Sequence, residues 1–143
     1  MQTPKIMETD ADRKREKTVA SKIEQAWNCQ LVEMPKLSWF DYCASRDGKI
    51  VAYIEIKTRT NSQDAYSTYM ISATKITKGL NAARVLRIKF LLVVQFTDAL
   101  MFVDVSKAKF SLGIADRKDV NCIEVVLQIP MNEFKTITLN KEN

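Results

Sequence analysis

The sequence contains no histidine among its 143 residues. This absence excludes serine–histidine and cysteine–histidine nucleophile systems, zinc sites with imidazole ligands, and proton shuttles that use an imidazole. Any chemistry must therefore depend on carboxylates, lysines and bound cations.

Cysteine and long apolar segments are also scarce. Cys29, Cys43 and Cys122 are odd in number and form no CxxC pair, so we predict no disulfide framework. The apolar run at residues 90–94 is far too short to span a bilayer, and residues 1–17 are too polar for a signal peptide. We expect a cytoplasmic protein with no membrane partner.

Positive charge is concentrated in one segment. The net charge is +5, but residues 57–89 contain a single acid, Asp64, and by themselves carry +6. The basic residues of this segment are Lys57, Arg59, Lys75, Lys78, Arg84, Arg87 and Lys89. Such a concentration is the usual footprint of a nucleic-acid backbone, although a solvated basic helix face explains it equally well in isolation.

The pattern of apolar and turn residues predicts one domain over residues 1–143, with residues 1–8 loose. We expect a helix over residues 10–28, capped by Thr9 or Asp10, and a second helix capped by Ser72. Strands are predicted at residues 30–34, 37–45, 49–59, 87–96, 99–105 and 123–129, with a polar loop at 61–67. The expected fold class is α/β, a mixed central β-sheet flanked by helices in the order αβββαββ plus a C-terminal strand.

The strand at residues 49–59 brings two charged side chains to one face. Side chains alternate along a strand, so Glu55 and Lys57 point to one side while Ile54 and Ile56 point to the other. A carboxylate and an ammonium group are therefore neighbours on a rigid strand.

The position of Asp41 depends on the turn that joins the two middle strands. An odd-numbered loop centred on Gly48 places Asp41 opposite Glu55 on the same face. A tight two-residue turn at Asp47 and Gly48 pairs Asp41 with Ile54 instead, because a slip of one residue inverts every side chain. We favour the odd loop or a compensating bulge, since otherwise Asp41 would lie unpaired on the apolar face.

Two opposed carboxylates repel each other unless a cation lies between them. A hard dication with oxygen ligands removes this repulsion. The alternative is a cross-strand salt bridge between Lys57 and the acids, worth ~1 kcal/mol or less.

Asp41, thirteen further residues and then Glu55-Ile56-Lys57, after a helix that contains Glu24, resembles the PD-(D/E)XK nuclease superfamily. The superfamily includes restriction endonucleases and the Holliday-junction resolvases of archaea and phages, and the small members of the latter kind are the most similar. The resemblance covers residues 10–105 and implies a restriction-endonuclease-like core. It departs from the family pattern at Phe40, where proline commonly precedes the aspartate.

The resemblance implies roles for individual residues. Asp41, Glu55 and the backbone carbonyl of Ile56 would bind Mg²⁺, for which Mn²⁺ would substitute, and Lys57 would orient or deprotonate the attacking water. Glu24 would reach the metal directly or through water, although a solvated helix residue is an equal alternative. The residues expected to contact DNA are Lys75, Lys78 and Arg59.

Some assignments stay open in the sequence. Burial would lower the pKa of Lys57 and the neighbouring carboxylates would raise it, so we favour electrostatic stabilisation over proton abstraction for this lysine. Tyr66 and Tyr69 flank the polar loop and could touch substrate, but packing explains them at least as well.

The function predicted from these patterns is a magnesium-dependent DNA endonuclease, acting on branched or junction DNA, and as a homodimer because two sites could cut two strands. The alternatives are a non-catalytic nucleic-acid-binding protein with a nuclease-like fold and a structural domain whose charges form salt bridges.

Overall fold

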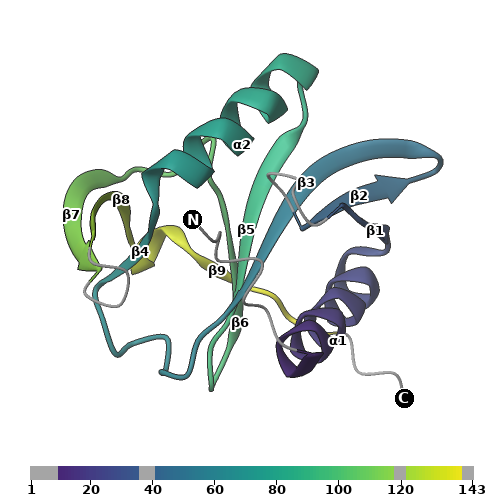
Figure 1. Ribbon diagram of the computed structural model, residues 1–143. Helices are drawn as coiled ribbons and strands as arrows, with labels where there is room; N and C mark the ends of the chain where they lie inside the picture. Colours follow the sequence, from purple (N-terminus) through teal and green to yellow (C-terminus); the bar gives the residue numbers. More distant parts are fainter. Residues whose placement is uncertain (1–9, 36–40, 118–121, 140–143) are drawn as a thin grey trace.

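The computed structural model describes residues 10–35, 41–117 and 122–139 (Figure 1). In chain order, the elements are α1 (Asp10–Trp27), β1 (Gln30–Glu33), β2 (Tyr42–Arg46), β3 (Lys49–Thr58), β4 (Thr68–Ser72), α2 (Ala73–Leu86), β5 (Lys89–Gln95), β6 (Leu100–Asp104), β7 (Ser111–Arg117), β8 (Cys122–Pro130), the short 3₁₀ helix η3 (Met131–Glu133) and β9 (Lys135–Thr136). Over these ranges, no helix combines the length and apolar character that crossing a membrane requires.

The strands form two sheets. The larger has the order β1-β2-β3-β5-β6-β9, and the smaller has the order β4-β8-β7. Within the larger sheet β3 and β5 pair in parallel, while the other neighbours are antiparallel. The predicted class, an α/β fold with a mixed central sheet flanked by helices, is confirmed.

Helix α1 covers one face of the large sheet. Its buried residues Val19, Ala20 and Ile23 pack against the side chains of β3 that alternation assigned to the apolar face, among them Ile54 and Ile56. Burial of this helix stripe fixes the orientation of β3, because the residues between the isoleucines must then face the other way.

The opposite face is covered by α2 and the small sheet, which lie across the central strands from α1 (Figure 1). Ile76 and Ala83 of α2 and Ile129 of β8 pack there with Phe90 and Leu92 of β5. Glu55 is on this side, so it is enclosed between the large sheet and the start of α2.

The hairpin of β2 and β3 contains both a tight two-residue turn and a bulge. From the sequence alone, these two features were alternatives. Asp47 and Gly48 have φ angles of 53° and 77° and form a tight two-residue turn, with Arg46 opposite Lys49. The odd loop is therefore wrong. The register then shifts between Ala44 and Ser45, a bulge that leaves Val51 as the extra residue.

The bulge restores the predicted pairing. Beyond it Tyr42 lies opposite Ile54, so the preceding Asp41 comes opposite Glu55. The compensating bulge that we expected is thus present, and both carboxylates belong to one face of the hairpin.

Several details differ from expectation. Strands β4, β7 and β9 were not predicted, and β4 begins directly after the polar loop. Ser72 holds the predicted N-cap position, but its side chain makes no capping hydrogen bond. Thr9 and the predicted strand residues 37–40 lie outside the described residues.

Candidate active site

Glu55 is the centre of the site. Its side chain is 1% exposed, and its Oε2 lies 3.5 Å from Lys57 Nζ and in a close ion pair with Lys75 Nζ. Its other oxygen, Oε1, is buried and has no hydrogen-bond partner among the described residues. A buried carboxylate with one unsatisfied oxygen retains a strong capacity to bind a further cation or donor.

Asp41 is fixed beside Glu55 by three hydrogen bonds. Its backbone N–H donates to the Ile54 carbonyl over 3.2 Å, and its carbonyl accepts the Met34 N–H over 2.9 Å. Its Oδ2 accepts the N–H of Ile56 over 2.8 Å. Because the N–H and C=O of a strand residue point to the same edge, the Ile56 carbonyl is also directed toward the Asp41 side.

Burial and charge shift the pKa values of three groups in this cluster. Desolvation, followed by the nearby charge of Asp41, raises the pKa of Glu55 against the opposing effect of the lysines. Desolvation lowers the pKa of Lys57 more than Glu55 raises it. Desolvation acts on Lys75 in the same direction, but its ion pair with Glu55 prevails and the pKa of Lys75 is raised.

The two lysines thus differ in charge behaviour. The ion pair with Glu55 raises the pKa of Lys75, whereas burial lowers the pKa of Lys57. Of the two opposing effects named from the sequence, burial is the larger at Lys57, and the charge of Lys75 adds to it, so the pKa of Lys57 is lowered. The role of Lys57 as electrostatic stabiliser or base stays a prediction.

The residues present fit a hard dication. The donors are two carboxylates on one face, one of them with an unsatisfied oxygen, and a backbone carbonyl directed to the same edge. In the described ranges no three Asp, Glu or Cys side chains gather into a metal-binding group. A bound ion would therefore complete its coordination with water or substrate oxygens, which is the habit of Mg²⁺.

Glu24 is not brought into this cluster. Its Oε2 accepts the N–H of Leu31 over 2.8 Å, so it fastens the end of α1 to the start of β1. Helix α1 also packs on the face of β3 opposite to Glu55. No described contact joins Glu24 to the cluster, because helical periodicity gives a residue's side of the helix but not what that side packs against. A role of Glu24 toward the metal stays a prediction.

The residues predicted to contact DNA surround the cluster. Lys78 is exposed one turn after Lys75 on α2. Arg59 follows β3, donates its N–H to the Gln95 carbonyl over 2.9 Å, and holds its guanidinium 4.9 Å from the Tyr69 ring centroid. Charge therefore extends from the buried lysines to both sides of the site.

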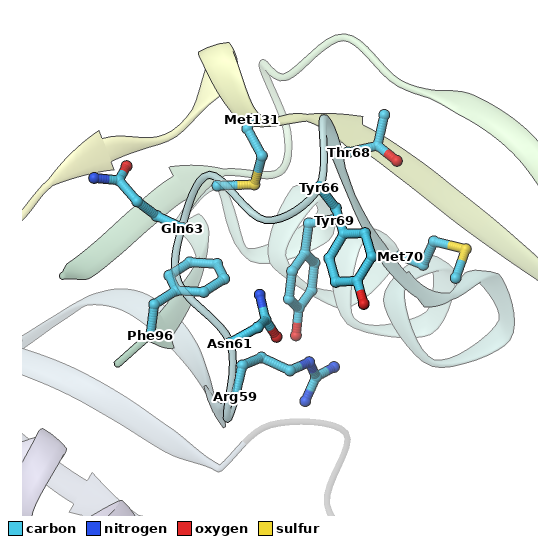
Figure 2. Close-up of a pocket in the computed structure, with 9 residues that line it drawn as sticks. All are labelled: Arg59, Asn61, Gln63, Tyr66, Thr68, Tyr69, Met70, Phe96 and Met131. Carbon is cyan, nitrogen blue, oxygen red and sulfur yellow. The ribbon is translucent and has the colours of Figure 1, made fainter. Parts of the chain in front are cut away.

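A cavity of about 300 Å³ lies beside Arg59, and sequence reasoning did not identify it. Figure 2 shows the residues that line it, which come mainly from the polar loop and β4. The sequence signal for this cavity was the pair Tyr66 and Tyr69 beside the polar loop. The cavity itself could not be predicted, because strand β4, which places Tyr69 in its wall, was not predicted.

This mixed sheet, with an aspartate, a buried glutamate and lysines on adjacent elements, defines the fold of the PD-(D/E)XK nucleases. The solved structure of Hjc, a Holliday junction resolvase from the archaeal hyperthermophile Archaeoglobus fulgidus, is similar with a TM-score of 0.57 and 14% sequence identity. The aligned region covers 82% of this chain and 82% of Hjc, and at this identity the likeness shows the fold alone.

The family model described as "Phage putative PDDEXK endonuclease" matches residues 2–137. The chain therefore belongs to this phage family of PD-(D/E)XK endonucleases. No curated protein matches the chain.

Proposed function

We propose that this nuclease is a metal-dependent endonuclease that hydrolyses DNA phosphodiester bonds at branched or junction DNA. The observation that carries the proposal is the convergence of Asp41, Glu55 and Lys57 on one buried position, with Lys75 completing the charge. The fold likeness to a Holliday junction resolvase supports the choice of branched DNA. Mg²⁺ is the proposed metal, with Mn²⁺ as its substitute.

Asp41 and Glu55, with the Ile56 carbonyl, hold the ion in this proposal. When bound, the ion supplies positive charge to the phosphate oxygens and lowers the pKa of a coordinated water. Asp41 is positioned for this by the hydrogen bond that its Oδ2 accepts from the Ile56 N–H.

Lys57 and Lys75 have separate roles in the proposal. Lys75 stays charged and stabilises the extra negative charge of the pentavalent phosphate. Lys57, whose pKa is lowered by burial, orients the attacking water and accepts its proton as the water oxygen bonds to phosphorus. The bond between phosphorus and the leaving oxygen breaks in the same displacement, and that oxygen takes a proton from solvent water. Lys78 and Arg59 bind the flanking phosphates, and a homodimer would present two such sites to two strands.

A nicking assay tests the proposal. Supercoiled plasmid, a four-way junction, linear duplex and single-stranded DNA are incubated with the protein in Mg²⁺, Mn²⁺ or EDTA. We expect cleavage with either metal, none in EDTA, and paired symmetric nicks at the branch of the junction. The Lys57→Ala variant should lose more than a hundredfold in rate.

The matched control is Lys107→Ala. Lys107 is exposed and follows β6, at the opposite end of β5 from Gln95. This variant should cut like the wild type, which excludes a contaminating nuclease. Salt-sensitive DNA binding without cleavage in either metal would contradict the proposal and favour a non-catalytic nucleic-acid-binding protein.

A further inference from the structure

The cavity beside Arg59 is part of the same surface as the catalytic cluster. Arg59 lies two residues after Lys57, and its guanidinium is stacked on the ring of Tyr69. The charges of Arg59 and Glu55 both act on the Tyr69 hydroxyl. The cavity therefore lies close to the catalytic cluster, with Arg59 and Tyr69 between them.

Tyr69 contributes a buried hydroxyl to the lining of the cavity. The residue is 5% exposed, and its ring is held edge-on by Phe96 and Phe134, with centroids 6.3 Å and 5.8 Å away. Its hydroxyl is buried without a hydrogen-bond partner among the described residues. Figure 2 shows this hydroxyl on the side of the cavity where Asn61 and Arg59 lie. An unpaired buried hydroxyl destabilises a protein unless a ligand uses it.

Tyr66 contributes a large ring that packing does not explain, because the residue is 69% exposed. Its loop is nevertheless anchored. The Asn61 carbonyl accepts the Thr97 N–H over 3.1 Å, and the Gln63 N–H donates to Asp98 Oδ1 over 2.9 Å. At the other end the Ser67 carbonyl accepts the Met131 N–H over 2.9 Å. The exposed ring is thus presented by a loop that is fixed at both ends.

We propose that this cavity receives one unpaired nucleobase of the strand that is cut. The base stacks on Tyr66, the Tyr69 hydroxyl bonds its edge, and Arg59 binds an adjacent phosphate. The substrate class is then single-stranded DNA or branched DNA with an unpaired base at the cleavage position. This inference rests on the proposed function, because it assumes that DNA lies across the catalytic cluster.

The lining matches a base better than a charged ligand. Its members are aromatic rings, two thioethers, two amides and hydroxyls, with Arg59 at the edge and no acidic residue among them. Aromatic faces and thioethers suit the face of a base, and amides and hydroxyls suit its edge. A base inside a stacked duplex cannot enter such a cavity without being extruded, so an already unpaired base enters at lowest cost.

The test compares two oligonucleotides of equal length in EDTA, a homothymidine strand and a strand of abasic sites that keeps the same phosphates. Dissociation constants are measured by fluorescence anisotropy for the wild type, Tyr66→Ala, Tyr66→Phe and Phe110→Ala. Phe110 is a matched control because it is an exposed aromatic residue, 47% exposed, that does not line the cavity. Exposed positions are chosen so that folding is unaffected.

We expect the wild type to bind homothymidine roughly tenfold more tightly than the abasic strand, as stacking of one base provides. Tyr66→Ala should lose this preference and bind the abasic strand unchanged, whereas Tyr66→Phe and Phe110→Ala should keep it. Tyr69→Phe, which retains the ring, should weaken homothymidine binding alone.

The outcomes separate the inference from the proposed function. Metal-dependent cleavage without a base preference, or a preference that survives Tyr66→Ala, overturns the inference and leaves the nuclease. A base preference lost in Tyr66→Ala, in a protein that cuts no DNA, supports the cavity and overturns the nuclease proposal. Absence of binding to either strand overturns the inference, and the nicking assay then decides the nuclease proposal separately.

Discussion

Glu55 combines complete burial, a carboxylate neighbour and an unsatisfied oxygen. Each of these lowers the stability of the metal-free protein, and a bound cation relieves all three. Residues that are costly in the empty protein and relieved by a ligand are typical of functional positions. The energetics of this one side chain therefore offer a test of the site that does not depend on detecting cleavage.

Glu55→Gln should raise the melting temperature of the metal-free protein by a few degrees at pH 8. The folded state holds the proton of Glu55 more tightly than the unfolded state, so the wild type loses stability as pH rises from its ordinary pKa of 4.5 through the raised value. The increase in melting temperature of Glu55→Gln over the wild type should therefore disappear at pH values below 4.5, where Glu55 is protonated in both the folded and the unfolded state. Calorimetry across this pH range measures it.

The same variant reports on the metal. Ca²⁺ or Mg²⁺ should raise the melting temperature of the wild type in a concentration-dependent way, because the ion binds only the folded state. Glu55→Gln should show little or no such response. An equal response in both proteins would place the ion elsewhere.

Lys75→Met should destabilise the protein by roughly 3 kcal/mol, because it leaves the buried Glu55 charge without its closest partner. The effect should grow as pH rises through the pKa of Glu55, since only the ionised carboxylate needs the lysine. In the double variant with Glu55→Gln most of the loss should be recovered. The free energies of unfolding of the wild type, the two single variants and the double variant are measured with urea. Additive changes in these free energies would argue against the ion pair of Lys75 and Glu55.

At this scale the sequence predicted the residues whose positions depend on strand alternation. Glu55 and Lys57 were placed on one face because a strand has a fixed period of two, whereas Asp41 was joined to them by the family resemblance and by the expected loop or bulge. The ion pair of Lys75 with Glu55 could not be read, because it depends on how α2 packs over β3. The position of Glu24 relative to the cluster could not be read for the same reason, since both concern the docking of a helix.

Among the elements, the hairpin of β2 and β3 decides whether the two carboxylates meet. Its tight turn alone would place Asp41 on the apolar face, and the bulge at Val51 corrects this by one residue. Turn residues have a strong local signature, but a bulge has almost none, because it is selected by packing on both faces of the sheet. For that reason the sequence predicted that Asp41 lies opposite Glu55, but it did not decide between an odd-numbered loop and a bulge.

Gly48→Ala should destabilise the protein by about 1 kcal/mol. An added methyl group would meet nothing within 4 Å, so the loss would come only from the backbone angle, with φ at 77°. Asp47→Gly in the same turn is the control and should be neutral or slightly stabilising, because Asp47 also has a positive φ. Chemical denaturation of both variants checks this, and an unaffected Gly48→Ala would contradict the two-residue turn.

Strand β4 shows why the small sheet escaped prediction. Its five residues alternate between buried positions, such as Tyr69 and Ile71, and outward ones, such as Met70. Such a short run directly before a helix carries little local signal, and it is a strand because β8 pairs with it. Long-range partners of this kind are not visible in the sequence.

For the whole molecule, the concentration of positive charge in residues 57–89 becomes a spatial feature. Some of these charges are buried in the cluster, as with Lys57 and Lys75, and others are exposed on α2. The buried ones lie beside Glu55, and the exposed ones are those that we propose to contact the phosphate backbone. The basic residues of this segment thus form two groups, a buried one beside Glu55 and an exposed one on α2.

Lys78→Ala should weaken binding to duplex and single-stranded DNA alike, by about threefold to tenfold at low salt. The slope of log affinity against log salt should fall by about one, because one phosphate contact and its released counterion are lost. Titrations at several salt concentrations measure this, with Lys107→Ala as the control. An unchanged slope would remove Lys78 from the DNA path.

Tyr69 and Lys75 lie on one uninterrupted piece of chain, since α2 begins at the residue that follows the end of β4. One continuous segment therefore contains both Tyr69 in the cavity wall and the Lys75 ammonium group beside Glu55, with Ser72 between them. A nucleobase bound in the cavity as proposed would contact this segment directly. Its binding would then be coupled to the position of the Lys75 ammonium group, which would be seen as a cleavage rate that depends on the base at that position.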